Sequence, residues 1–243
     1  MKTTGTDKKI AVVVGSSGSI GLAIAKALGE DGYLVIGWQR TNQSAIPLHN
    51  IQSVDLTSES SVIRAAEETM RLVGRVDLLV YAAGYLAVSD IADLEVEQWD
   101  QMFNVNVRGL FLTAKHLVRL ANINVIVPIG SVAAHVGAND SFGYTASKGG
   151  MRSLSFALAQ LYAPRTRVVL VSPAWVDGGF TDQVREGLAE KDNLDELARQ
   201  AHLLERMCKP QEVADVVLYV ASDKASFMTG TEVMVDGGFI IRR

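Results

Sequence analysis

The segment Ile10-Ala11-Val12-Val13-Val14-Gly15-Ser16-Ser17-Gly18-Ser19-Ile20-Gly21 decides the fold that the sequence predicts. A short apolar run that ends in glycine is typical of a strand buried on both faces of a parallel sheet. Three glycines then permit a tight turn, and the spacing of Ile20, Ile24 and Leu28 predicts a helix directly after it. A strand, a glycine turn and a helix in this order indicate an anion-binding helix N-terminus.

Strands and helices alternate along the rest of the chain. Further strands are predicted at 33–37, 53–54, 76–81, 125–129, 167–171 and 232–235, with helices at 58–71, 96–121, 144–162 and 210–221. This order predicts one α/β domain over 9–243, a Rossmann-type doubly wound parallel sheet with helices on both faces. Residues 1–8 are expected to form a flexible tail. The charge-rich stretch 177–209 breaks the alternation and is predicted to be a substrate lid.

The composition excludes several classes of protein. Of the 243 residues 48% are hydrophobic and 21% are charged, which excludes a disordered or fibrous chain. A net charge of −4 provides no excess of basic residues that would attract nucleic acid or an anionic membrane. No apolar run has the roughly 18 residues of a membrane helix. The single cysteine, Cys208, excludes an intrachain disulfide and fits a reducing compartment, so we expect a cytoplasmic protein. The four histidines lack metal-ligand spacing, and no metal site is expected.

The glycine turn and the end of the second strand together predict a dinucleotide site. The candidate phosphate-binding residues are Gly15, Ser16, Ser17, Gly18, Ser19, Ile20 and Gly21, in which the serines offer hydroxyl donors. An acidic residue about 20 positions on would select NAD(H), but the chain has Gln39 and Arg40 there. The planar fork of Arg40 suits a 2′-phosphate, so NADP(H) is the predicted cofactor and NAD(H) the alternative. A solvated surface arginine is the other interpretation of Arg40.

Asp55, followed by Leu56, comes directly after the third predicted strand. We predict that its carboxylate accepts a hydrogen bond from the adenine amino group. A second interpretation is a cap for the helix that begins near Ser58, and the two roles are compatible.

Four motifs carry a resemblance to a known family. They are Tyr144-Thr145-Ala146-Ser147-Lys148, Ser131 thirteen residues before that tyrosine, Asn106 within 104–109, and the ending Thr229-Gly230-Thr231-Glu232 to Val235-Asp236-Gly237-Gly238. From Ile10 to Phe239 the sequence resembles the short-chain dehydrogenase/reductase family, and bacterial 3-oxoacyl-carrier-protein reductases most of all. The resemblance also implies a homotetramer that assembles through the helices at 96–121 and 144–162.

The resemblance implies a role for each motif residue. Tyr144 is the catalytic acid/base, Ser131 orients the substrate carbonyl, and Asn106 holds a water that connects Lys148 to solvent. Lys148 lies four residues after Tyr144, on the same helical face, and is expected to bind the nicotinamide ribose. Work near pH 7 requires the tyrosine pKa to fall from about 10 to about 7, and a nearby ammonium and an oxidised, positively charged nicotinamide both act in that direction. Further implied cofactor contacts are Ala83, Gly84, Pro173, Ala174 and Val176.

Two departures from the family pattern concern the dinucleotide site. The glycines fall at Gly15, Gly18 and Gly21, with Ser19 where the family usually has glycine. This spacing resembles the extended branch of the family, and we interpret it as a local variant. Tyr81-Ala82 replaces two asparagines, which removes a hydrogen bond worth about 1 kcal/mol.

Two further departures concern the nicotinamide loop. Ala174 replaces a glycine and is tolerated only if its φ is negative. Gly178 replaces the threonine that binds the nicotinamide carboxamide in the family. Thr181 is the substitute if the loop is rearranged, and the backbone N–H of Val176 remains as a donor.

These residues predict an NADP(H)-dependent ketoreductase of a small-molecule ketone or secondary alcohol, such as a β-ketoacyl or natural-product carbonyl. The candidate pocket residues are His135, Trp175 and Phe180, for which loop exposure or core packing is the alternative. One competing function is an NAD-dependent alcohol dehydrogenase. Another is a dinucleotide-binding sensor or partner protein without turnover, which Ala174 and Gly178 keep open.

Overall fold

Seven parallel strands form the centre of the molecule in the order β3-β2-β1-β4-β5-β6-β7. The computed structural model describes residues 8–41, 45–137, 140–182 and 193–242. The strands are β1 Ile10–Val14, β2 Leu34–Gln39, β3 Asn50–Ser53, β4 Leu78–Tyr81, β5 Val125–Pro128, β6 Arg167–Pro173 and β7 Thr231–Val235. This topology confirms the predicted doubly wound α/β sheet. Most of the predicted tail at 1–8, and residues 183–192 of the predicted lid, lie outside the described residues.

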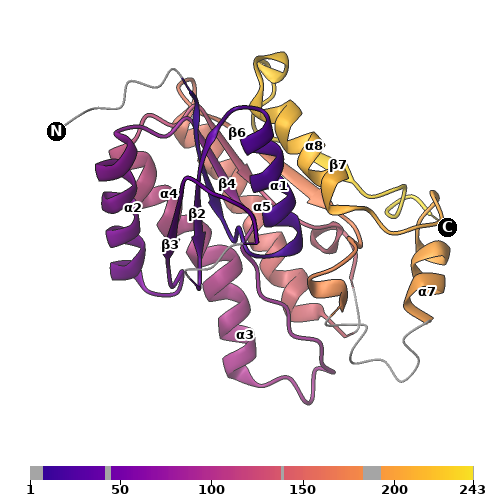
Figure 1. Ribbon diagram of the computed structural model, residues 1–243. Helices are drawn as coiled ribbons and strands as arrows, with labels where there is room; N and C mark the ends of the chain where they lie inside the picture. The colour runs from indigo at the N-terminus through magenta and orange to yellow at the C-terminus, as the bar shows by residue number, and fades with distance from the viewer. Residues whose placement is uncertain (1–7, 42–44, 138–139, 183–192, 243) are drawn as a thin grey trace.

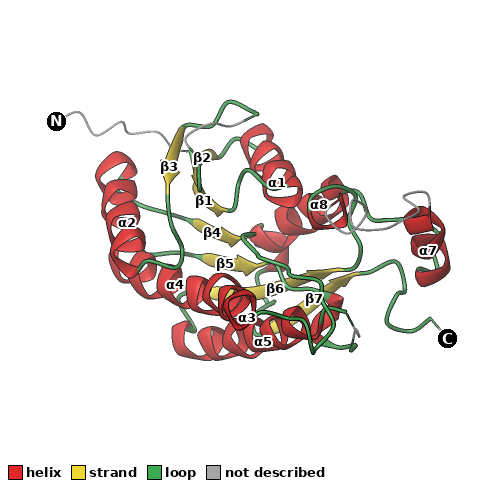
Figure 2. Ribbon diagram, turned by 90° about the horizontal axis from the view of Figure 1, so that it is seen from below, coloured by secondary structure: helices red, strands yellow, loops and turns green. Residues whose placement is uncertain are grey.

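Helices cover both faces of the sheet (Figures 1 and 2). On one face lie α1 Ser19–Glu30 and α8 Pro210–Ala221, and on the other α2 Glu59–Val73, α4 Gly109–Leu120 and α5 Phe142–Tyr162. The described residues also form α3 Val96–Phe103 and α7 Asn193–Ala201. Alternate residues of β1 supply the two cores, since Ala11 and Val13 pack toward α1 and α8 while Val12 and Val14 pack toward α2 and α4. Every residue of β1 is therefore buried, as a strand covered on both faces requires.

The helical region predicted over 96–121 is confirmed, but its middle holds a π-helical turn that the sequence did not predict. A π-helical turn over Asn104–Arg108 separates α3 from α4. The buried Tyr81 of β4 donates its hydroxyl to the Val105 carbonyl at 2.5 Å, and Gly109 leaves room for that hydroxyl. A π turn inserts one residue into a helix and so re-aims a side chain, here that of Asn106.

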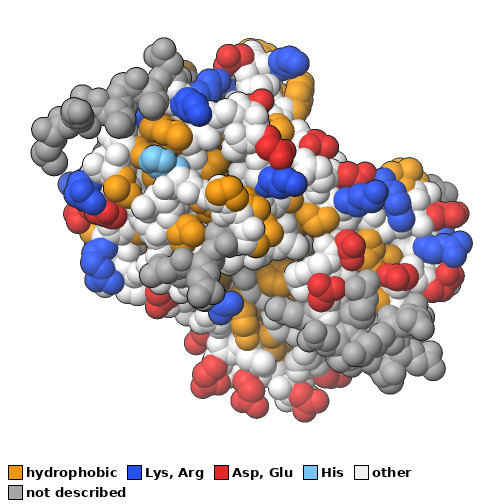
Figure 3. All heavy atoms as spheres, in the orientation of Figure 1, with side chains coloured by type: hydrophobic (Ala, Val, Ile, Leu, Met, Phe, Trp, Pro, Cys, Tyr) orange, Lys and Arg blue, Asp and Glu red, His pale blue; other side chains and the backbone are white. Residues whose placement is uncertain are grey.

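Charged side chains are spread over the face drawn in Figure 3, and acidic ones gather around the end of α3. Asp93, Glu95, Glu97 and Asp100 are exposed there. This acidic surface contributes to the net charge of −4 and is unfavourable for a polyanion. Within the described ranges, no helix combines the length and apolar character that crossing a membrane requires.

Replacing Tyr81 by phenylalanine tests the link between β4 and the π turn. The variant keeps the buried ring but loses the hydroxyl that binds the Val105 carbonyl, so we expect the free energy of unfolding to fall by about 1–2 kcal/mol. Urea denaturation measures the change. Tyr219→Phe, at an exposed position on α8, is the control and should unfold like the wild type. An unchanged midpoint for Tyr81→Phe would show that this hydrogen bond contributes nothing.

Candidate active site

The glycine loop lies where the order of the strands reverses, between β1 and β4. Gly15 has φ +84°, and a Cβ on it would stand 2.6 Å from the backbone nitrogen of Ala83. Gly21 in turn packs against the carbonyl of Gly15. Only glycine permits these backbones to approach so closely. The crevice at such a reversal is the ligand site of open α/β sheets, so the predicted loop and Ala83 meet in the expected place.

The N-terminus of α1 has the form that a dinucleotide pyrophosphate needs. Its N-cap residue, Gly18, has no side chain to cap the first N–H groups, and Ser17 and Gly18 are exposed. Free N–H groups and the positive end of the helix dipole together favour an anion. Ser16 differs from its prediction as a hydroxyl donor to phosphate, because it is buried and donates instead to Gln39 Oε1 at 2.6 Å.

The ends of β2 and β3 form the rim of this crevice. Gln39 is buried and ties the strand end to the glycine loop through Ser16, while the next residue, Arg40, is exposed. Asp55 is exposed and accepts from the backbone and hydroxyl of Thr57 at 2.9 and 2.7 Å. The cap of α2 is Ser58 itself, which accepts from the Ser61 amide. Leu56 packs against the core beside Asp55.

Tyr144, Lys148 and Ser131 come together at the carboxyl end of β5. Tyr144 and Lys148 lie on one face of α5, with Nζ 5.5 Å from the centroid of the tyrosine ring. Ser131 lies close enough to Tyr144 for its hydroxyl to influence the pKa of the phenol. Lys148 is buried and donates from Nζ to the Ile129 carbonyl at 2.8 Å, which anchors α5 to the end of the strand.

Burial controls the electrostatics of this pair in the protein alone. It raises the pKa of Tyr144 above its ordinary value, and the nearby Ser131 hydroxyl only partly offsets this. Burial also lowers the pKa of Lys148 to about 7, because an ammonium loses its hydration there. The amine is thus readily deprotonated near neutral pH, and by itself it does not favour ionisation of the phenol. In the protein alone the phenol stays protonated. The fall of the tyrosine pKa, which includes the charge of a bound oxidised nicotinamide, stays a prediction.

Asn106 is fully buried on the π turn, and its side chain is occupied within the protein. Its Oδ1 accepts from the Tyr85 amide at 2.8 Å, and its Nδ2 donates to the Tyr85 carbonyl at 3.0 Å and to Ser147 Oγ at 2.8 Å. It therefore joins the segment after β4 to α5 at the residue before Lys148. These contacts give Asn106 an anchoring position, and the water relay implied by the resemblance stays a prediction.

The loop after β6 explains two of the sequence departures. Among the described residues Glu205 is the one non-glycine with positive φ, so Ala174 meets the condition set for it. Gly178 and Gly179 have φ +84° and +59°, and a threonine at 178 would be strained in this conformation. The Thr181 hydroxyl donates to the Val176 carbonyl at 2.5 Å and so stabilises the loop.

The three predicted pocket residues lie in different surroundings. The Phe180 ring meets Tyr144 edge-on at 6.1 Å, and a Cβ on Gly84 would stand 3.2 Å from its tip. Because Gly179 lies against Ser19, residues 178–180 cross the crevice from the glycine loop to Tyr144. Trp175 packs instead against His202 and Phe239, with ring centroids 5.9 and 6.2 Å away.

His135, the third pocket candidate, binds Glu232, for which the sequence predicted no separate function. Arg152 and Ser172 bind the same carboxylate. The sequence feature that could have pointed to this network is Glu232 itself, since a carboxylate in a predicted strand needs hydrogen-bonding or charged partners when it is buried.

Comparison with known proteins agrees with this geometry. The sequence profile of a family described as enoyl-(acyl carrier protein) reductase matches residues 14–240. The cyclopentanol dehydrogenase of Comamonas sp. (strain NCIMB 9872) is 32% identical over 249 residues, which cover 95% of this chain and 96% of that protein. The 3-oxoacyl-[acyl-carrier-protein] reductase FabG of Aquifex aeolicus (strain VF5) is 30% identical over 95% of this chain and 96% of its own length.

Comparison with solved structures supports the same fold. The ligand-free aldohexose dehydrogenase of Thermoplasma acidophilum has a TM-score of 0.92 at 28% identity, covering 97% of this chain and 95% of that one. The chain therefore belongs to the short-chain dehydrogenase/reductase family of oxidoreductases, which implies a nicotinamide dinucleotide cofactor and an alcohol or carbonyl substrate.

Proposed function

We propose that this protein is an NADP(H)-dependent ketoreductase that interconverts a ketone and a secondary alcohol. The observation that carries the proposal is the grouping of Ser131 and Tyr144 with the buried amine of Lys148 beside the tyrosine ring. This group stands next to the crevice between the glycine loop and Ala83, where the uncapped N-terminus of α1 favours an anion. The similar cyclopentanol dehydrogenase and 3-oxoacyl reductase support the substrate class.

The protein residues supply the proton and hold the carbonyl. When bound, the nicotinamide supplies the hydride that adds to the carbonyl carbon. Tyr144 donates its phenolic proton to the oxygen, so that hydride and proton together convert the ketone to the alcohol. The Ser131 hydroxyl donates a hydrogen bond to the same oxygen and stabilises the charge that develops on it. The Lys148 amine, with its pKa near neutrality, is suited to restoring the proton of Tyr144.

The protonated state of Tyr144 in the protein alone suits the proton donation that carbonyl reduction requires. Oxidation requires the phenolate, and burial opposes its formation. An NAD-dependent alcohol dehydrogenase is therefore the second candidate, favoured by the names of the similar cyclopentanol dehydrogenases. A sensor without turnover is disfavoured because Ser131, Tyr144 and Lys148 are assembled.

Residues 177–209 are proposed to act as a lid over the substrate site. Phe180 fills the space between Gly84 and Tyr144, so a substrate reaching the phenol from that side must displace it. The positive φ angles of Gly178 and Gly179 mark the position where the backbone changes direction before Phe180. Glycine hinges of this kind permit a loop to open and close.

Tyr144→Phe tests the proton donor. Loss of a general acid should lower kcat for ketone reduction by roughly 10²–10⁴-fold, while the dinucleotide dissociation constant changes little. Initial rates of NADPH oxidation over a panel of ketones, with fluorescence titration of NADPH, measure both quantities. Tyr162→Phe, at the far end of the same helix, is the matched control and should keep its activity. Undiminished turnover by Tyr144→Phe would refute the assigned role.

Arg40→Ala tests the choice of cofactor. If the guanidinium pairs with the 2′-phosphate, the variant should lose about 10- to 100-fold in NADPH affinity and little in NADH affinity. Calorimetric titrations of both dinucleotides decide the matter, with the exposed Arg64→Ala on α2 as control. Equal affinity of the wild type for the two dinucleotides would remove the case for NADP(H).

A further inference from the structure

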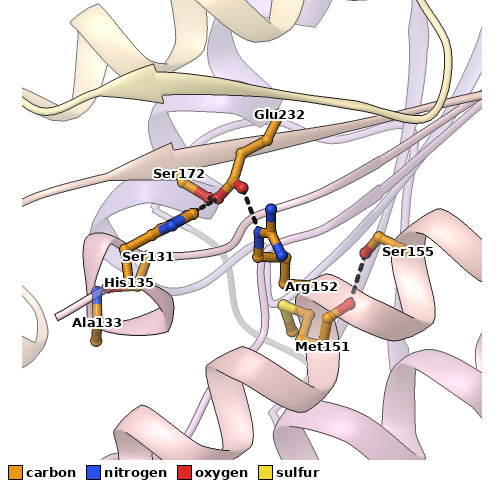
Figure 4. A network of polar contacts seen from close by, with 8 residues as sticks. All are labelled: Ser131, Ala133, His135, Met151, Arg152, Ser155, Ser172 and Glu232. Atoms are coloured by element: carbon orange, nitrogen blue, oxygen red, sulfur yellow. Dashed lines mark hydrogen bonds and ion pairs between the residues drawn. The ribbon is translucent and has the colours of Figure 1, made fainter. Parts of the chain in front are cut away.

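Glu232 is a buried carboxylate that joins three separate parts of the active-site framework (Figure 4). Its side chain on β7 is 8% exposed. Its Oε1 accepts from Ser172 Oγ at 2.6 Å and lies 2.9 Å from His135 Nε2, and its Oε2 accepts from Arg152 Nε at 2.7 Å. Burial alone would raise the pKa of Glu232, but these three contacts outweigh it and keep the pKa below its ordinary value. The carboxylate is therefore ionised and held in place.

The first link leads to the Ser131 hydroxyl. Ser131 begins the short 3₁₀ turn Val132–Ala134, and His135 ends it. Ser131 also accepts from the Ala133 amide at 3.1 Å, which fixes its own end of the turn. The Ser131 end of this turn thus lies beside Tyr144, and the His135 end binds Glu232. Figure 4 shows His135 reaching across to the carboxylate from the segment that carries Ser131.

The second link leads to the helix of the catalytic pair. Arg152 lies on α5 four residues after Lys148 and eight after Tyr144, so the three share one face of the helix.

The third link leads to the end of β6. Ser172 packs against Gly130, since a Cβ on Gly130 would collide with the Ser172 hydroxyl. Ser172 also directly precedes Pro173 of the nicotinamide loop. One carboxylate therefore connects the segments that carry Ser131, Tyr144 and the loop after β6.

We propose that Glu232 is a positioning residue that sets the distance between the Ser131 hydroxyl and the Tyr144–Lys148 pair. It acts through His135 and Arg152. The proposal rests on the ketoreductase function proposed above, since it assumes that Ser131 and Tyr144 face one carbonyl oxygen. A group held out of place by a fraction of an ångström loses much of its catalytic effect, so the carboxylate should influence rate more than cofactor binding.

Glu232→Ala and Glu232→Gln test the proposal through kinetics. We expect Glu232→Ala to lower kcat by about 10- to 100-fold and to leave KM for the dinucleotide within about 2-fold. Glu232→Gln keeps an oxygen for Ser172 and His135 but presents an amide to Arg152, so its kcat should fall between those of Glu232→Ala and the wild type. A merely structural role would lower the melting temperature and leave kcat per folded molecule unchanged.

A second readout needs no turnover. The ¹³Cζ NMR signal of Tyr144, identified by its absence in Tyr144→Phe, reports how the Ser131 hydroxyl lies relative to the phenol. In Glu232→Ala this signal should move toward its position in Ser131→Ala. His135→Ala, at a partly exposed residue, should move it in the same direction. This measurement decides the positioning role even if the wild type reduces none of the ketones tried, an outcome that would count against the proposed function alone.

Glu59→Ala is the matched control. Glu59 Oε1 also binds one basic side chain and one histidine, Lys115 Nζ and His116 Nε2, both at 2.8 Å, but it joins α2 to α4. This variant should leave kcat and the Tyr144 signal unchanged. The proposal is overturned if Glu232→Ala and His135→Ala both keep the Tyr144 signal in place, or if a folded Glu232→Ala keeps the wild-type kcat.

Discussion

The active site depends on an amine that the fold holds out of water. Lys148 extends from α5 beneath the ring of Tyr144, and its described contacts are the Ile129 carbonyl and the Met151 sulfur. An ammonium in such surroundings loses hydration that one carbonyl does not replace, so its proton is held weakly. A lysine in this position is suited to exchanging a proton with the phenol beside it. The same burial keeps the phenol protonated, the form that reduces a carbonyl.

The surrounding structure fixes this pair from several directions. Asn106 joins the π turn to α5 at Ser147, the residue before the lysine. Tyr81 holds the π turn from β4, where the family usually has an asparagine, so the departure is compensated by a different hydrogen bond. Buried polar groups that are fully satisfied in this way make a site rigid. The rigidity comes from segments far apart in the sequence, which meet because parallel strands end at one edge of the sheet.

The sequence predicted the elements with strong periodicity and the residues with a family motif. The continuous apolar run at Ile10–Val14 and the proline-initiated helix at Pro210–Ala221 were located correctly, and Ser131, Tyr144 and Lys148 meet as the motif implied. The π turn was missed because one inserted residue hardly changes a helical pattern. Residue spacing carries no information about burial, so it did not predict that burial raises the pKa of Tyr144 in the protein alone. The Glu232 network joins residues up to 97 positions apart, which local pattern does not connect. The NADP(H) preference and the homotetramer stay predictions.

Titration of the buried Lys148 amine tests its charge most directly. Protein labelled with ¹³C and ¹⁵N lysine, observed by NMR between pH 5 and pH 11 without dinucleotide, gives a titration curve for each side chain, and the Lys148 signal is identified by its absence in Lys148→Met. We expect a midpoint near pH 7 for Lys148. A midpoint near 10.5, as for a lysine in water, would contradict it.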